Sequence, residues 1–131
     1  MALAMAVMPP ALGAKLEIVV ANIRTGEGHI RVAVCSAETF LKDSCQVNGE
    51  MLALPGEVML RLEVPPGTWA VQAFLDENDD RVINRSFFGI PTEGLGFSND
   101  APFRFGPPNF GDAAFSLGAG GGRIRLTLRY Y

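Results

Sequence analysis

The sequence contains a single histidine, His29, and only two cysteines. One imidazole cannot build a multi-histidine metal site, and a Ser-His-Asp triad would depend on a residue at the start of an expected strand. Cys35 and Cys45 show neither the C-x-x-C spacing of redox proteins nor a set of zinc ligands. The glycine motifs that bind phosphates and dinucleotides are missing too. These absences argue against most familiar catalytic arrangements.

Positive charge is also scarce. The net charge is −3 and the isoelectric point is about 5.1, and nine of the eleven basic residues are arginines dispersed along the chain. A nucleic-acid-binding protein needs a basic face to neutralise phosphates, so this class is disfavoured. Arg123, Arg125 and Arg129 share one expected strand face, and we interpret them as a solvated stripe.

No hydrophobic run is long enough to span a bilayer. The opening "MALAMAVMPPALGA" is apolar and ends in small residues, which is typical of a secretory signal remnant over residues 1–14 with cleavage after Ala14, although no basic segment precedes it. The alternative, a buried first strand, would be interrupted by Pro9-Pro10. We therefore expect a periplasmic or secreted protein, with no transmembrane segment in the mature chain and one domain over residues 15–131.

The two cysteines fit an oxidising compartment. A Cys35–Cys45 disulfide would close a short loop across an expected turn and stabilise the fold by about 2–3 kcal/mol. The alternative is two buried free thiols.

Short alternating segments dominate the rest of the chain, and no long helical pattern is present. Hairpin turns are expected at residues 24–28 and 118–122, and Asn48-Gly49 is expected to turn within a bent or edge strand. The expected strands cover residues 15–23, 28–36, 46–54, 57–64, 69–75, 113–117 and 123–130. About seven short strands predict an all-β, two-sheet antiparallel β-sandwich of immunoglobulin-like or transthyretin-like type, with Trp69 as a core anchor.

A long insertion, residues 76–112, separates the last expected strands. Loops of this length are uncommon in compact domains and are usually functional or disordered. Aromatic rings favour order, because each buried ring contributes roughly 2–3 kcal/mol. We expect most rings to cap one end of the sandwich and one or two to be exposed at a site. The insertion holds six of the nine phenylalanines: Phe87, Phe88, Phe97, Phe103, Phe105 and Phe110.

The insertion opens with "DENDDRVIN", which partly matches a calcium-binding loop. Carboxylate and carbonyl oxygens are the ligands that Ca²⁺ prefers. Arg81 stands where such a loop favours glycine, and Phe87 stands where it has a bidentate glutamate. Glu77, Asp79 or Glu93 could supply the missing carboxylate, and a solvated acidic turn is the alternative. The expected ligands are Asp76, Asn78, Asp80, the carbonyl of Val82, and Asn84.

Further along, "FGIPTEGLGFSND" (88–100) has no segment that we expect to form a regular strand. Its side chains can tie the loop's own N–H groups or can bind a ligand, and both readings stay open. The expected binding loop consists of Glu93, Phe97, Ser98 and Asn99. A carboxylate-based reaction would require Asp76, Asp80 and Glu93 to converge within roughly 10 Å.

Several of these segments together resemble a known family. Pro66-Gly67 precedes the strand of Trp69, and "DEN" (76–78), "GIPTEGLGFSN" (89–99) and "GPPNF" (106–110) follow in order. This pattern is similar to domain-of-unknown-function family 2141, uncharacterised exported bacterial proteins, over residues 16–131. The resemblance implies an exported β-sandwich related to transthyretin-like and carboxypeptidase-regulatory-like domains, and it implies no activity.

Three functions follow as hypotheses. The first is a non-enzymatic binding or accessory module that uses residues 76–112 against a cell-envelope ligand or protein. The second is a carboxylate- or metal-dependent hydrolase. The third is a structural domain stabilised by calcium or by the disulfide.

Overall fold

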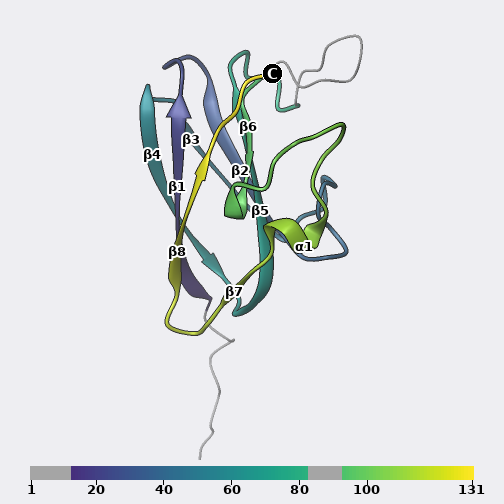
Figure 1. Ribbon diagram of the computed structural model, residues 1–131. Helices are drawn as coiled ribbons and strands as arrows, with labels where there is room; N and C mark the ends of the chain where they lie inside the picture. The colour runs from purple at the N-terminus through teal and green to yellow at the C-terminus, as the bar shows by residue number, and fades with distance from the viewer. Residues whose placement is uncertain (1–12, 83–92) are drawn as a thin grey trace, which may run out of the picture.

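The computed structural model describes residues 13–82 and 93–131, which form eight strands in two facing sheets (Figure 1). Two short helical segments, η1 (Ser98–Asp100) and α1 (Phe110–Ala113), lie between the sixth and seventh strands. The strands are β1 (Ala14–Ile23), β2 (His29–Cys35), β3 (Val47–Leu52), β4 (Gly56–Val64), β5 (Gly67–Asp76), β6 (Leu95–Phe97), β7 (Phe115–Leu117) and β8 (Gly122–Thr127). The expected β-sandwich is confirmed.

Three strands form one sheet in the order β4-β1-β8, and the other sheet has the order β3-β2-β5-β6, with β7 paired to the beginning of β5. All pairs are antiparallel except one, since β1 and β8 run parallel with Ile18 opposite Ile124. The expectation of purely antiparallel sheets was therefore wrong at this pair.

The expected hairpins at residues 24–28 and 118–122 were also wrong. The first joins β1 to β2 and the second joins β7 to β8, and each pair of strands belongs to two different sheets. A glycine-rich turn reverses the chain equally well within a sheet or across a sandwich. Turn chemistry therefore locates the reversals but does not show which strands pair.

Two strands, β3 and β6, differ from what the sequence predicted for their segments. β3 is an edge strand, as expected, but it continues through Asn48-Gly49 without a turn. The segment 88–100 does contain a strand, β6, which pairs with β5 and brings the count to eight. Its glycines make this position available: a Cβ on Gly96 would lie 3.0 Å from the Thr127 carbonyl oxygen, and one on Gly94 would lie 2.5 Å from the Tyr130 ring.

The main core lies between the sheets, where alternate side chains of each strand meet. Fully buried examples are Leu16, Ile18, Ile30, Val34 and Leu126. Trp69 is less central than expected, because it is only partly buried and its indole N–H donates to the Pro65 carbonyl at 2.7 Å.

The basic stripe of β8 lies on the outer face of the three-stranded sheet. Arg123 and Arg61 both donate to Glu17, and Arg125 pairs with Glu57. These mostly exposed ion pairs fit the expected solvated stripe for Arg123 and Arg125, whereas Arg129 lies beyond the end of β8 and its backbone bridges to Leu95.

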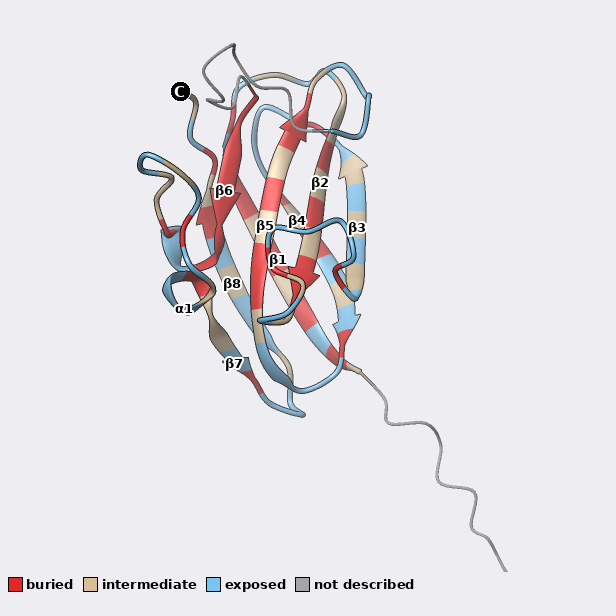
Figure 2. Cartoon of the chain, turned by 90° about the vertical axis from the view of Figure 1, so that its right-hand side faces the viewer, coloured by how far each residue is buried: buried red, intermediate tan, exposed pale blue. Residues whose placement is uncertain are grey.

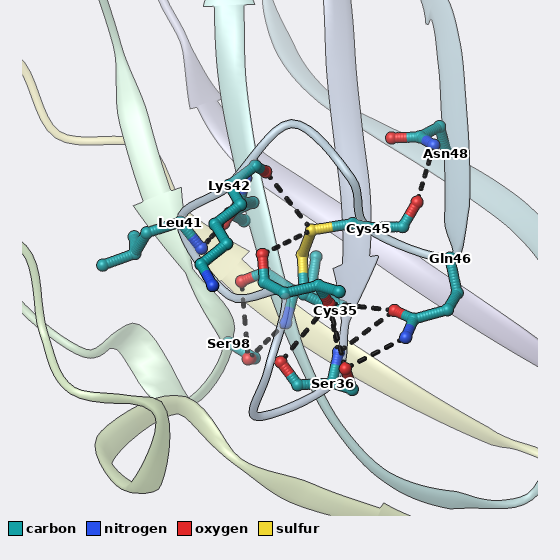
Figure 3. Close-up of a disulfide and its surroundings, with 11 residues drawn as sticks. Cys35, Ser36, Leu41, Lys42, Cys45, Gln46, Asn48 and Ser98 are labelled. Carbon is teal, nitrogen blue, oxygen red and sulfur yellow. Dashed lines mark hydrogen bonds between the residues drawn. A yellow bond between two sulfur atoms is a disulfide. The ribbon is translucent and has the colours of Figure 1, made fainter.

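A second apolar cluster covers half of the outer face of the five-stranded sheet. The loop 36–46 folds over this face and contributes Phe40, whose ring makes edge-to-face contacts with Phe97 and Phe110 at 5.9 Å each. Rings of the insertion are therefore packed, but the expected location at one end of the sandwich was wrong, because they lie on a sheet face, and Phe105 is exposed. The expected Cys35–Cys45 disulfide is present beside it (Figure 3). Phe87 and Phe88 lie outside the described residues.

We predict that the double variant Cys35→Ala/Cys45→Ala loses about 2–3 kcal/mol of unfolding free energy, because the unfolded chain is no longer constrained by the crosslink. Urea unfolding with and without a reductant measures this loss. The reductant should lower the unfolding midpoint of the wild type and leave that of the double variant unchanged. An unchanged wild-type midpoint would contradict the prediction.

Candidate functional site

Beside the buried centre of the second apolar cluster, the outer face of the five-stranded sheet carries two rows of side chains that line an opening. The strand register places Asn48, Ala33 and Gln72 side by side on β3, β2 and β5. The neighbouring row contains Glu50, Arg31, Phe74 and Leu95. Figure 2 looks onto this face, with the loop after β2 passing in front of the strands.

These rows form the floor of an open groove with a volume of about 650 Å³. Leu41, Lys42 and Asp43 from the disulfide-closed loop border it, as do Arg81 and Val82 from the acidic turn after β5. The small side chain of Ala33 between two longer amides leaves the floor hollow. The size lies within the range of small-molecule sites in proteins.

Arg31 organises the charges of the groove. Its Nε donates to Asp76 at 2.6 Å, Nη1 donates to Glu50 at 2.9 Å, and Nη2 donates to Asp79 at 3.4 Å. The hydrogen bond to Asp76 raises the pKa of Arg31 against the opposing effect of burial. Arg81 also donates to Glu50, at 3.4 Å, so one carboxylate bridges two guanidinium groups.

Asp76 holds the acidic turn together. Its side chain is fully buried, and its oxygens accept the backbone N–H groups of Asp80 at 3.2 Å and Arg81 at 2.8 Å. Arg81 adopts φ 68°, so it takes the left-handed conformation that glycine would favour at that place. The two hydrogen bonds that Asp76 accepts stabilise the turn, although the turn has Arg81 in place of a glycine.

The same turn contributes to a cluster of three carboxylates. One oxygen each of Asp76, Asp80 and Glu93 lies within 4.8 Å of the others. Such a spread suits Ca²⁺, whose oxygen ligands stand at 2.3–2.6 Å. The convergence that the hydrolase hypothesis requires is thus present in the structure.

The other carboxylates that could have supplied a ligand make contacts elsewhere. Glu77 is paired with Arg24, and Asp79 contacts His29 Nδ1 at 2.6 Å. Asn78 Oδ1 accepts from the Asp80 amide at 3.3 Å, which is a contact within the turn. Val82 is exposed at the groove, and Asn84 lies outside the described residues.

Within the expected binding loop the described contacts are structural. Phe97 is buried in the aromatic cluster. Ser98 is buried, and its Oγ accepts from the Val71 amide at 2.9 Å and donates to the Ala113 carbonyl at 2.5 Å. Asn99, with φ 60°, donates to the Ala114 carbonyl at 2.8 Å. Glu93 accepts from the Glu77 amide at 3.1 Å. These residues join the insertion to the sheet.

Five residues of the groove were not predicted as site residues from the sequence: Arg31, Ala33, Asn48, Gln72 and Phe74. All five occupy outward positions of three expected strands, at residues 28–36, 46–54 and 69–75, where no ligand site was predicted. One sequence feature does mark the face: an outward alanine and an outward phenylalanine on β2 and β5 interrupt the polar pattern. The hollow itself results from three strands that are distant in sequence.

The fold and the groove define a small β-sandwich protein with an open recess on one sheet. Residues 18–125 match the model of domain-of-unknown-function family 2141, described as an uncharacterized protein conserved in bacteria, and the chain belongs to this family. No curated protein matches the chain, and no solved structure matches it either. The relation to transthyretin-like domains stays a prediction. Among the described residues, no helix is long and apolar enough to cross a membrane.

We predict that Ser98→Ala destabilises the protein by about 2–4 kcal/mol, because it leaves the buried N–H of Val71 and the carbonyl of Ala113 without their partner. Chemical unfolding measures the loss. Ser116→Ala, at an exposed position of β7, is the matched control and should change stability by less than about 0.5 kcal/mol. Equal effects of the two variants would contradict the structural role of Ser98.

Proposed function

We propose that this protein is an exported, non-enzymatic binding module of the bacterial cell envelope that holds a small ligand in the groove. The groove itself is the observation that carries the proposal. Its floor combines apolar side chains with a few polar ones, which is the composition of ligand sites. The proposed binding surface is therefore the outer face of the five-stranded sheet beside the insertion. It replaces the binding loop 93–99 that was expected from the sequence.

Two features support export. The apolar opening of residues 1–14 resembles a secretory signal remnant, and the Cys35–Cys45 disulfide suits an oxidising compartment. β1 begins at Ala14, which is buried and opposite Val64, so cleavage after Ala14 would remove only the first residue of this strand.

The charges at the groove favour binding over catalysis. Arg31, Arg81 and Glu50 are tied to one another, and Arg31 also neutralises the buried Asp76. The single histidine contacts Asp79 and does not line the groove. Side chains that are held in ion pairs can present a surface of fixed shape to a ligand.

We expect Ala33→Leu to abolish binding, because the larger side chain fills the hollow between Asn48 and Gln72. The probe is the low-molecular-weight fraction of digested bacterial cell envelope, added to the isotopically labelled protein. In the wild type, backbone amide shifts should concentrate on β2, β3 and β5. Ala33→Leu should remove these shifts at unchanged melting temperature.

The control for this experiment is Val19→Leu, which enlarges a half-buried side chain on the three-stranded sheet. It should preserve the shifts of the wild type. Shifts that persist in Ala33→Leu, or that map outside the groove, would overturn the proposal.

A calcium-stabilised acidic turn is the second candidate function, and the three converging carboxylates favour it. Two of them, Asp76 and Glu93, are buried at 0% and 5% exposure. Carboxylates removed from water repel one another, and Arg31 provides one compensating charge. A bound cation would add to that compensation and fix the border of the groove. A metal-assisted hydrolase would use the same three residues.

We predict that Ca²⁺ at about 100 times its Kd adds about 2.7 kcal/mol of stability, a rise of several degrees in melting temperature. Asp80→Asn should abolish the rise, since the amide is a poorer cation ligand and can still accept from the Val82 amide. Asp43→Asn, an exposed residue at the opposite border of the groove, is the control and should retain it. Identical melts in Ca²⁺ and in chelator would contradict this candidate.

A further inference from the structure

The floor of the groove contains two amide side chains whose orientations are set by backbone partners. Gln72 Oε1 accepts the backbone N–H of Leu41 at 3.0 Å. A backbone N–H can only donate, so the oxygen of Gln72 must face Leu41 and its NH₂ group must face away. Among the described residues this NH₂ group has no hydrogen-bond partner. It is therefore a donor in the groove.

Asn48 has the opposite arrangement. Its Nδ2 donates to the Cys45 carbonyl at 3.2 Å, which can be followed in Figure 3. Because a carbonyl can only accept, the nitrogen of Asn48 is fixed on that side and Oδ1 is its remaining acceptor. The groove thus offers a donor from Gln72 and an acceptor from Asn48, on either side of Ala33.

The spacing of the two side chains suits an amide group. Asn48 and Gln72 stand on the strands that flank β2, so their Cα atoms are about 9.6 Å apart, two strand spacings. An amide spans about 2.3 Å from nitrogen to oxygen. With two hydrogen bonds of about 2.9 Å it bridges about 8 Å. A ligand amide can therefore donate to Asn48 and accept from Gln72 where the two side-chain tips incline toward each other over Ala33 to a separation of about 8 Å.

The charge and polarity of the groove indicate a neutral ligand with a short apolar end. Arg31 and Arg81 are already bound to Glu50, and Lys42 has Asp43 beside it in the chain. The groove residues include three cations and two carboxylates, and Asp76, which accepts from Arg31 beside the groove, compensates the third cation, so no uncompensated charge selects an ion. The methyl of Ala33 and the ring of Phe74 provide an apolar floor below the two amides.

We propose that the groove binds the acetamido group of an N-acetylated amino sugar, an inference that rests on the proposed function above. The acetamido amide bridges Asn48 and Gln72, and its methyl group lies on Ala33. The sugar hydroxyls reach the polar side chains of the border, such as Lys42, Asp43 and Glu50. A peptide would carry substituents on both sides of its amide, whereas the acetamido methyl is terminal and fits the single hollow at Ala33.

Tri-N-acetylchitotriose is the probe, and cellotriose is its matched control because it carries a hydroxyl in place of each acetamido group. In a titration followed by nitrogen-15 NMR, the acetylated trimer should shift the side-chain NH₂ signal of Gln72. Cellotriose should bind at least about tenfold more weakly, since it leaves the two protein amides unpaired.

The decisive variant is Gln72→Glu. A glutamate keeps an oxygen for the Leu41 N–H but replaces the NH₂ donor by a second acceptor, so affinity for the acetylated trimer should fall at least about tenfold. Gln46→Glu makes the same change in charge outside the groove, where Gln46 contacts Ser36, and should retain wild-type affinity. Melting curves confirm that both variants are folded.

Equal affinity for the two trimers or equal effects of the two variants would each overturn the assignment. So would failure of the acetylated trimer to bind at all. If the envelope fraction still shifts the groove signals in an Ala33-dependent way, the ligand class is wrong and the binding function stands. If neither probe reaches the groove, both proposals fail.

Discussion

The buried ion pair between Arg31 and Asp76 connects the sandwich to the surface that it presents. Asp76 is the last residue of β5 and accepts from Arg31 on β2 and from two amides of the turn that follows. A Cβ on Gly28 would lie 1.9 Å from the Asp76 carbonyl oxygen, so the entry to β2 packs closely on the same residue. The pair therefore fixes where β5 ends and where the acidic turn begins.

Stability alone does not account for such a pair. Desolvation of two charges can exceed their mutual attraction, and a hydrophobic pair of similar volume is often as stable. The value of the Arg31–Asp76 pair lies in the number of directed bonds that each group makes. Asp76 orders the turn, while Arg31 positions Glu50 at the groove and also contacts Asp79 of the turn. A pair of hydrophobic side chains would leave that border without its hydrogen bonds.

Alternation of side chains was enough to predict the strands, since β1, β2, β4 and β5 all lie close to their expected ranges. It did not predict their partners, because a turn such as residues 24–28 has the same chemistry in a hairpin and in a connection between sheets. The strand β6 was missed for a related reason. It has three residues, one of them Gly96, and it exists because it pairs with β5, while Leu95 also exchanges hydrogen bonds with Arg129 far along the chain.

For the candidate site, the sequence indicated the acidic cluster but did not indicate the groove. The carboxylates Asp76, Asp80 and Glu93 were named in advance and do converge. Ser98 and Asn99 also appeared functional, yet their polar groups satisfy backbone atoms of the neighbouring segments. Polar residues in an irregular segment serve either purpose, and only the fold decides which backbone groups need partners.

The disulfide links the fold to the candidate site. It closes the loop 36–45, which places Phe40 in the aromatic cluster and the amide of Leu41 against Gln72. The backbone of this loop also fixes Asn48 through the Cys45 carbonyl. Both amides of the proposed sugar site are thus oriented by the loop that the crosslink constrains. In the proposed mode of binding, the disulfide therefore both stabilises the domain and orients the donor and the acceptor that the ligand meets.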